Sequence, residues 1–453
     1  MQYPVMPVQS RTTWASLRRR TDVLLRKSFV LPSLLLIVGA MWRVWWVRRH
    51  FTIRIGGEAG HVALSFARDG TIADTFYRGE RPTTHLSPIA PIIDGSVLRL
   101  LGIETRTSTW ALSFLAIGCC LGAAIVLYRA FAVMGVPRAS RLAALALACL
   151  LPLNQFTETD EFRFWEGGMA VLLSAAILWL TVAWDRGGAV DLPRIAALAL
   201  LVALLAFVSP ALGLAGYANL ALLLWRRVPA RRWAPAIAVA ALALAAVLTP
   251  WTIRNYAAFG RFVPLRGNAG LELALANHPA AVSGTDAAAV FRARERQIHP
   301  DGEPAVIARM RAEGGEIPYA DRLGREARAW IGQHPGDFVR LSLRHLRQFF
   351  FPPRWFWTLY GERERGVDAK WLLTGLTGLA GLAGAAACLL WWRERMLYAA
   401  TIVLMPALPY MVVQPILRYR YLVLFPLMFL GVEVTRRLWV LATERRSTDR
   451  RAA

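Results

Sequence analysis

The sequence predicts an all-α polytopic membrane protein with about ten transmembrane helices. Hydrophobic residues make up 56% of the 453 residues, and the chain holds 18 tryptophans. Apolar runs of roughly 20 residues, the length that crosses a bilayer, recur along the chain. Basic residues cluster between particular runs, as they do in membrane proteins with a fixed orientation.

Window hydropathy gives ten candidate spans. In chain order they cover about 29–47, 108–131, 139–155, 166–184, 194–208, 210–225, 233–250, 371–392, 397–414 and 420–440. The fifth and sixth runs are short and share a tight Ser209-Pro210 turn, so they are either two crossings or one re-entrant hairpin. In the eighth run, glycines recur at every third position from 375 to 384, a pattern that lets a helix pack closely on a neighbour.

The formal net charge of the chain is +23, and its basic residues are distributed as the predicted topology requires. Arginines cluster in residues 1–28, in the loop around Arg226 to Arg232, and in the tail 441–453. With ten spans these three regions lie on one side, as the positive-inside rule requires, so both termini are expected in the cytoplasm. This placement argues against nucleic acid as a partner and favours contacts with membrane lipids.

Two long segments interrupt the series of spans. We call residues 48–107 the first long segment and residues 251–370 the second long segment. Both are expected on the outer side, and loops of this length are usually functional. The predicted organisation is therefore a module over 29–250 that includes the first long segment, then the second long segment, and then C-terminal spans over 371–440.

Helical patterns are expected within both long segments. In the first they cover about 58–68 and 88–101, and in the second about 304–312, 319–332 and 336–350. The last of these carries an apolar face opposite Arg340, Arg344 and Arg347. Such a helix either lies in the membrane interface or packs on a soluble subdomain, and both alternatives remain open.

Several motifs in these segments resemble one family of membrane enzymes. The chain resembles bacterial lipid-linked-sugar glycosyltransferases of the GT-C fold, in the superfamily of protein O-mannosyltransferases and aminoarabinose transferases (glycosyltransferase family 39). The stretches that carry the resemblance are Gly57-Glu58-Ala59-Gly60, Leu86-Ser87-Pro88-Ile89-Ala90-Pro91, Pro250-Trp251-Thr252-Ile253-Arg254-Asn255-Tyr256, His334-Pro335-Gly336-Asp337-Phe338 and Arg418-Tyr419-Arg420-Tyr421.

The resemblance implies a GT-C-like bundle in the bacterial inner membrane. It also implies transfer of a sugar from a polyprenyl-phosphate donor to a lipid, glycan or protein acceptor on the periplasmic face. Glu58 corresponds to the acidic residue of the first loop that acts as base or metal ligand. Glu166 corresponds to an acidic residue after the third span. If a divalent metal ion is used, Glu58 and Glu166 are its candidate ligands.

Transfer with inversion makes two chemical demands that the sequence can meet. The acceptor hydroxyl needs a general base, for which a carboxylate is adequate, and Glu58 and Glu166 are the candidates. The departing phosphate needs positive charge, which guanidinium groups supply well. The candidates for phosphate binding are Arg254, Arg266, Arg418 and Arg420, and secondary candidates are His85, Asp160 and Glu161.

Simpler roles are open for the same residues. The arginines could reach lipid headgroups, and Glu166, Asp160 and Glu161 could cap the helix that follows. A transporter or flippase of a lipid-linked saccharide would also need many spans and outward arginines. The spans are nearly free of charge away from Arg43 and Glu433, and no duplicated halves are visible, which favours the enzyme over such a carrier.

Overall fold

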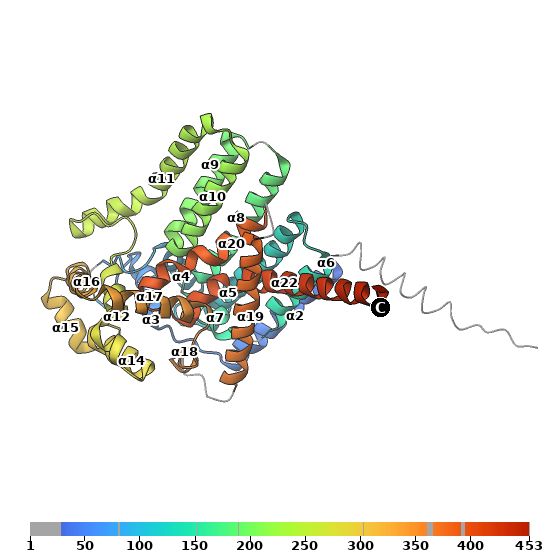
Figure 1. The fold of residues 1–453 in the computed structure, drawn as a ribbon. Coiled ribbons are helices and arrows are strands. Elements are labelled where there is room, and N and C mark those ends of the chain that lie inside the picture. Colours follow the sequence, from blue (N-terminus) through green and yellow to red (C-terminus); the bar gives the residue numbers. More distant parts are fainter. Residues whose placement is uncertain are drawn as a thin grey trace, which may run out of the picture.

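The computed structural model is built almost entirely from helices (Figure 1). It describes residues 29–79, 82–151, 153–188, 190–301, 303–359, 366–390 and 395–452. The predicted basic tail 1–28 lies outside the described residues. Within them no β-strand forms, and one isolated antiparallel bridge joins Ala73 to Pro82. The all-α fold class is confirmed.

Each predicted span coincides with a helix or a short helical series. The helices are α2 (Val30–Arg49), α5 (Arg106–Val133), α6 (Arg138–Leu150) with α7 (Gln155–Thr159) and η1 (Glu161–Arg163), α8 (Gly167–Gly187), α9 (Leu192–Val208), α10 (Pro210–Arg227), η2 (Ala230–Arg232) with α11 (Trp233–Phe259), α19 (Val367–Leu390), α20 (Met396–Leu404) with η3 (Met405–Ala407) and α21 (Pro409–Val412), and α22 (Leu417–Ala452).

Fewer than the ten predicted spans are single helices long and apolar enough to cross a membrane, among the described residues. In the described part of the chain five pass that criterion, namely α2, α5, α8, η2 with α11, and α19. The pair formed by α6 and the 155–163 region passes as one span bent by 78°, and α9 and the α20–α21 region are shorter apolar helices. The structure therefore supports a membrane protein but not the count of ten crossings.

Small residues allow the closest helix pairs of the bundle. On α19, a Cβ atom added at Gly378 would lie 2.7 Å from the Phe350 carbonyl oxygen, and one added at Gly384 would lie 2.6 Å from that of Leu430. α19 thus approaches α17 at Gly378 and α22 at Gly384, at positions where only glycine fits. The predicted close packing of this glycine series is confirmed for Gly378, Gly381 and Gly384, whereas Gly375 faces open space.

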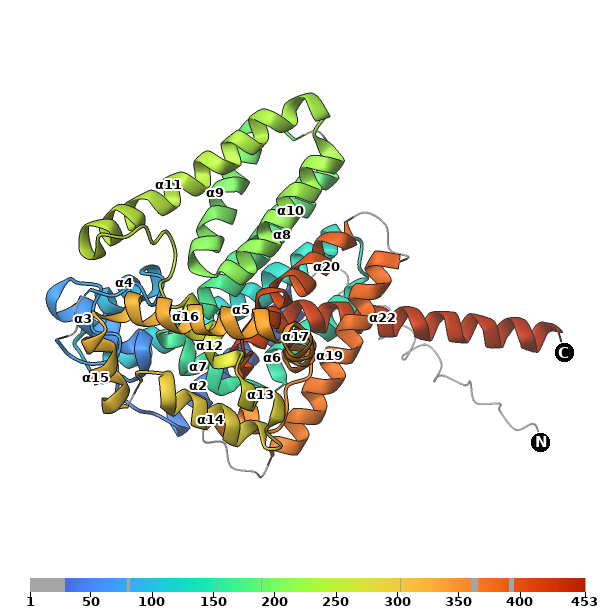
Figure 2. The same cartoon turned by 60° about the vertical axis from the view of Figure 1, so that its left-hand side comes forward.

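The two long segments gather at one end of the bundle (Figures 1 and 2). The first contains α3 (Gly57–Asp69) and α4 (Ile89–Leu101), close to the predicted bounds. The second contains α12 (Ala269–Ala276), α13 (Pro279–Ser283), α14 (Ala287–Ile298), α15 (Pro304–Ala312), α16 (Glu316–Gln333), α17 (Pro335–Phe350) and α18 (Trp355–Leu359). The predictions for α15, α16 and α17 are confirmed, and the shorter α12, α13, α14 and α18 were not predicted.

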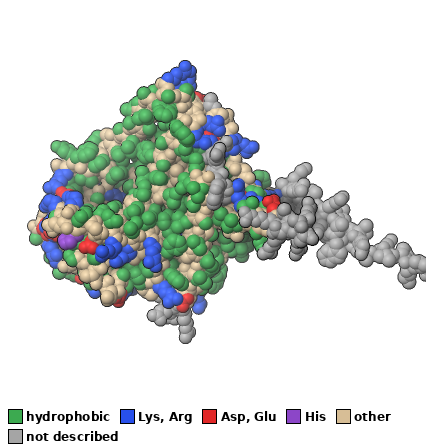
Figure 3. Space-filling model, viewed as in Figure 1, with side chains coloured by type: hydrophobic (Ala, Val, Ile, Leu, Met, Phe, Trp, Pro, Cys, Tyr) green, Lys and Arg blue, Asp and Glu red, His purple; other side chains and the backbone are tan. Residues whose placement is uncertain are grey.

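The surface of the bundle differs in composition from the surface of the end where the long segments lie. In Figure 3, hydrophobic side chains cover most of the visible bundle, whereas basic, acidic and histidine side chains gather where α15 and α16 lie. On α17 the buried face includes Leu341, His345 and Phe349, while Val339 and Leu343 of the predicted apolar face are more than half exposed. This helix therefore packs on the bundle and still presents apolar side chains outward.

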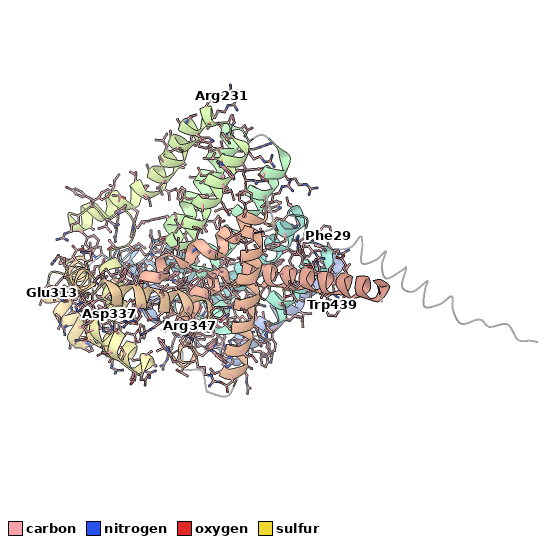
Figure 4. All side chains as sticks on the ribbon, in the orientation of Figure 1. Phe29, Arg231, Glu313, Asp337, Arg347 and Trp439 are labelled. Carbon is pink, nitrogen blue, oxygen red and sulfur yellow. The ribbon has the colours of Figure 1, made fainter. Side chains whose placement is uncertain are left out.

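The arrangement predicts which sites are accessible from outside the cell. Glu313 lies at the end opposite Phe29 and Trp439 (Figure 4). We expect a membrane-impermeant maleimide to label Asp69→Cys and Ala312→Cys in intact cells, because both positions are exposed in the long segments. Ala230→Cys, at the first residue of η2, should be labelled only after permeabilisation. The four native cysteines are buried, so background labelling should be low, and the reverse labelling pattern would exclude this orientation.

Candidate functional site

One pocket lies where the long segments meet the bundle. We call this cavity of about 430 Å³ the polar pocket. It is lined by the start of α3 and the 85–86 loop, by the 156–165 region, by the start of the second long segment, and by the start of α22. Its charged side chains are Arg54, Glu58, Asp160, Glu161, Arg163, Arg266, Glu272 and Arg418, with His85 beside them. Segments far apart in the sequence thus place carboxylates and guanidinium groups around one space.

Glu58 occupies the first turn of α3, where the backbone demands glycine. Gly56 is extended, and Gly57 has φ of +72°, a left-handed conformation that other residues adopt only with strain. The chain turns at Gly57 and enters the helix with Glu58 on the pocket wall. A carboxylate in the first turn also interacts favourably with the helix dipole.

Two histidines approach the buried side of Glu58. Its Oε1 lies 3.2 Å from Nε2 of His85 and 3.3 Å from Nε2 of His299, the residue that follows α14. Burial, the largest single effect, would raise the pKa of Glu58, but the charge and hydrogen bond of His85, together with the charges of His299 and Arg418, outweigh it and hold this pKa well below its usual range. Burial alone would lower the pKa of His85, but Glu58 raises it to about 9. At neutral pH, Glu58 is therefore a carboxylate and His85 carries a proton.

Glu316 and Arg254, which we together call the clamp, form hydrogen bonds with the donors and the carbonyl oxygens of the loop that carries His85. Glu316, the first residue of α16, accepts hydrogen bonds from the Thr83 hydroxyl at 2.7 Å, the Thr84 N–H at 2.5 Å and the Thr84 hydroxyl at 2.8 Å. Arg254 at the end of α11 donates to the carbonyl oxygens of Thr83, at 2.7 Å, and Ile72, at 2.6 Å. The second long segment thereby fixes the conformation of the first.

Arg266 connects the pocket to Glu166. Its Nη2 donates a hydrogen bond to Glu166 and another to the Val208 carbonyl oxygen at 3.0 Å. Its Nε–H is buried and finds no hydrogen-bond acceptor among the described residues. A buried donor without an acceptor is costly, so an oxygen of a ligand would stabilise this group. Glu166 itself is buried and is not among the residues that line the pocket.

Arg418 supplies another guanidinium group of the pocket. It lies 3.7 Å from Glu161 and stands over the rings of Trp165 and Tyr419, at 5.3 and 5.5 Å from their centroids. Nearly a third of its side chain remains exposed. Aromatic faces orient a guanidinium group, and Arg418 is one of the residues that line the polar pocket.

The 156–165 region forms a third wall of the pocket. Glu161 accepts a hydrogen bond from Thr157 at 2.6 Å, and Asp160 pairs with Arg163 at 3.1 Å. These contacts are local, so they support a role in shaping the wall. Deeper in the bundle, Glu158 pairs with Arg43 at 2.5 Å and accepts a hydrogen bond from Tyr421.

Two of the predicted phosphate ligands lie elsewhere. Arg254 belongs to the clamp described above and is not among the residues that line the pocket. Arg420 is buried between helices, where it donates to the carbonyl oxygens of Phe350 at 3.2 Å and Thr374 at 2.8 Å. Residues two positions apart on an α-helix are rotated by about 200° around its axis, so Arg418 and Arg420 cannot face one site.

The structure therefore brings Glu58, His85, Asp160, Glu161, Arg266 and Arg418 together, with Glu166 behind Arg266. Sequence reasoning missed His299, Glu316 and Glu272. Only their positions in a long segment predicted to be functional pointed to them. The sequence-based pairing of Glu58 with Glu166 as metal ligands differs from the contacts observed, since Arg266 engages Glu166 and the histidines face Glu58.

Comparison with known proteins adds no relative. No protein-family model matches the chain, and no curated protein matches it.

The clamp predicts a large effect for one carboxylate that does not itself line the pocket. Glu316→Gln should lower the free energy of unfolding by about 1.5–3 kcal/mol, the contribution of hydrogen bonds to a charged group. The matched control is Glu313→Gln, which removes a partly exposed pair with Arg322 and should cost less than about 1 kcal/mol. Equilibrium unfolding of purified protein in detergent measures both variants. Equal stability of the two would argue against the clamp.

Proposed function

We propose that the protein is an integral membrane glycosyltransferase that transfers a sugar from a polyprenyl-phosphate donor to an acceptor on the periplasmic side of the bacterial inner membrane. The observation that carries the proposal is the polar pocket, a single cavity that Glu58, Arg266 and Arg418 all line. A carboxylate opposite guanidinium groups suits a reaction that removes a proton at one point and releases a phosphate at another.

The arginines suit the donor phosphate. The unpartnered Nε–H of Arg266 and the exposed edge of Arg418 offer donors to phosphate oxygens. Because both groups are held by neighbouring side chains before a ligand arrives, little reorganisation is needed as negative charge develops on the leaving group.

Glu58 suits the acceptor hydroxyl. The acceptor oxygen forms a bond to the anomeric carbon while its proton moves to the Glu58 carboxylate. The bond from that carbon to the phosphate oxygen breaks, and the phosphate leaves with the electron pair. The low pKa of Glu58 keeps this group ionised before the reaction.

An apolar surface at the start of the second long segment suits a lipid-borne donor. Ile253 and Tyr256 near the end of α11, and Phe262 just after it, are exposed apolar or aromatic side chains. A prenyl chain in the bilayer could lie along such a surface while its phosphate enters the pocket. Lipid, glycan and protein acceptors are all compatible with this geometry.

The first test of this function is Glu58→Gln. The amide preserves the shape of the side chain but cannot accept a proton, so turnover at saturating donor should fall by roughly 10²–10⁴-fold. The matched control is Asp69→Asn, which removes an exposed carboxylate at the other end of α3 and should leave turnover unchanged. Product formation from a panel of polyprenyl-phosphate sugars provides the measurement. Near-wild-type turnover by Glu58→Gln would remove Glu58 from the chemistry.

A second test separates Arg418 from Arg420. Arg418→Lys should weaken donor binding by about 1.5–3 kcal/mol, or roughly 10–150-fold, because an ammonium group cannot form the two-pronged contact. Arg420→Lys should instead lower the melting temperature and leave donor affinity near that of the wild type, since its partners are backbone carbonyl oxygens.

Titration of donor and thermal melts distinguish these outcomes. Weakened donor binding in Arg420→Lys alone would contradict the assignment of Arg418. Movement of intact donor across proteoliposome membranes without sugar transfer would support the transporter alternative.

A further inference from the structure

Three potential metal-binding side chains meet at the wall of the polar pocket, which Glu58 and His85 line. The ligand atoms of Glu58, His85 and His299 all lie within 4.8 Å of one another. They come from three separate places, namely the start of α3, the loop before α4, and the turn after α14. Together they form a group of two imidazoles and one carboxylate.

The spacing fits coordination of a metal ion. In a tetrahedral zinc site with bonds of about 2.0–2.1 Å, neighbouring ligand atoms lie about 3.3 Å apart. Glu58 Oε1 lies 3.2 and 3.3 Å from the two Nε2 atoms. Two edges of such a coordination polyhedron are thus already present.

The hydrogen bonding of Glu58 also leaves room for an ion. Oε1 is buried, and the two nearest donors, Nε2 of His85 and Nε2 of His299, lie 3.2 and 3.3 Å away in poor alignment for hydrogen bonds. Poorly aligned donors stabilise a buried carboxylate oxygen only weakly, and a cation between the three ligand atoms would satisfy it better.

The shell around the three ligands is ordered and acidic. The Phe76 ring packs edge-on against both imidazoles, with centroids 4.9 and 5.8 Å from those of His85 and His299. The Glu316 clamp holds the His85 loop through Thr83 and Thr84. Glu272 and Glu316 act electrostatically on His85, Glu295 interacts with His299, and Arg418 acts on Glu58, so carboxylates are the more numerous charges near the two imidazoles. Shells of this kind orient ligands and increase metal affinity.

We propose that Glu58, His85 and His299 bind one divalent transition-metal ion, for which Zn²⁺ is the best match. Two imidazole nitrogens favour zinc over Mg²⁺, which prefers oxygen ligands in octahedral geometry. A water molecule or a further carboxylate oxygen completes the coordination.

Metal binding changes one contact at His299. The Asp301 N–H lies 3.3 Å from Nδ1 of His299, which places the ring proton on Nε2, facing Glu58. When a metal occupies Nε2, that proton leaves or moves to Nδ1, and the Asp301 contact is lost. This contact is exposed and links residues two apart, so its loss is a small cost.

The ion would cross-link two segments of the chain. It would join the start of α3 to the second long segment on the buried side of Glu58, while the part of Glu58 that lines the pocket stays available to ligand. The metal is thereby assigned an orienting role for this carboxylate. Bound metal is measured without any sugar donor. Failure of the metal-site proposal is therefore distinguishable from failure of the proposed function, on which the orienting role rests.

Metal content provides the direct test. Full-length protein purified from zinc-supplemented cells should carry one zinc ion per chain by mass spectrometry of the metal. His85→Ala and His299→Ala should lose it, whereas the control His334→Ala, an exposed histidine of the same long segment, should keep it. His299→Cys should restore binding, because a thiolate is also a zinc ligand and an imidazole needed only for packing would not be replaced by it.

Calorimetry and thermal melts complete the test. After chelation, zinc should bind the wild type more than about 100-fold more tightly than His299→Ala, since loss of an outer partner alone costs 10–100-fold. A chelator should lower the melting temperature of the wild type and leave that of His299→Ala unchanged. Wild-type protein that carries no zinc and does not respond to chelator would overturn the proposal. Equal zinc affinity in His299→Ala would overturn the ligand set.

Discussion

Arg43 carries a positive charge in the middle of an apolar helix, and the fold around the polar pocket depends on how that charge is satisfied. Its guanidinium group pairs with Glu158 at 2.5 Å and donates to the carbonyl oxygens of Ala148 and Cys149, at 3.0 and 2.9 Å. Those carbonyl groups belong to the end of α6, where the chain stops continuing as a regular helix. A buried charge in a membrane protein must be paired, so α2, the end of α6 and α7 are held together as one unit.

The consequence is the third wall of the pocket. Because α6 is followed by a break and not by another helical turn, residues 156–165 can bend back across the end of the bundle. Tyr421 donates to Glu158 from α22, and Arg418, about one turn earlier on that helix, stands over Trp165. One buried ion pair thus links the position of α22 to the wall on which its arginine rests.

Patterns within a few residues were sufficient for most of the fold, while the site needed contacts across the chain. Hydrophobic runs located the bundle helices, and helical patterns within the two long segments located α3, α4 and α15. Helical periodicity alone would have separated Arg418 from Arg420. No local pattern relates His299 to Glu58, because they meet only after two long segments pack. Arg254 was predicted to bind phosphate from its charge and place in the chain, but its hydrogen bonds to Thr83 and Ile72 depend on tertiary structure.

The Glu316 clamp also has a consequence in time. It joins Thr83 to a residue 233 positions later, so the loop of His85 acquires its partner only when α16 has been synthesised. At about 5–20 residues per second, that interval is roughly 10–50 s. During it, Glu58 and His85 belong to a nascent chain whose pocket has no second half. Contacts of such high sequence separation form late, and a chain that stops before residue 316 is made without the means to assemble this site.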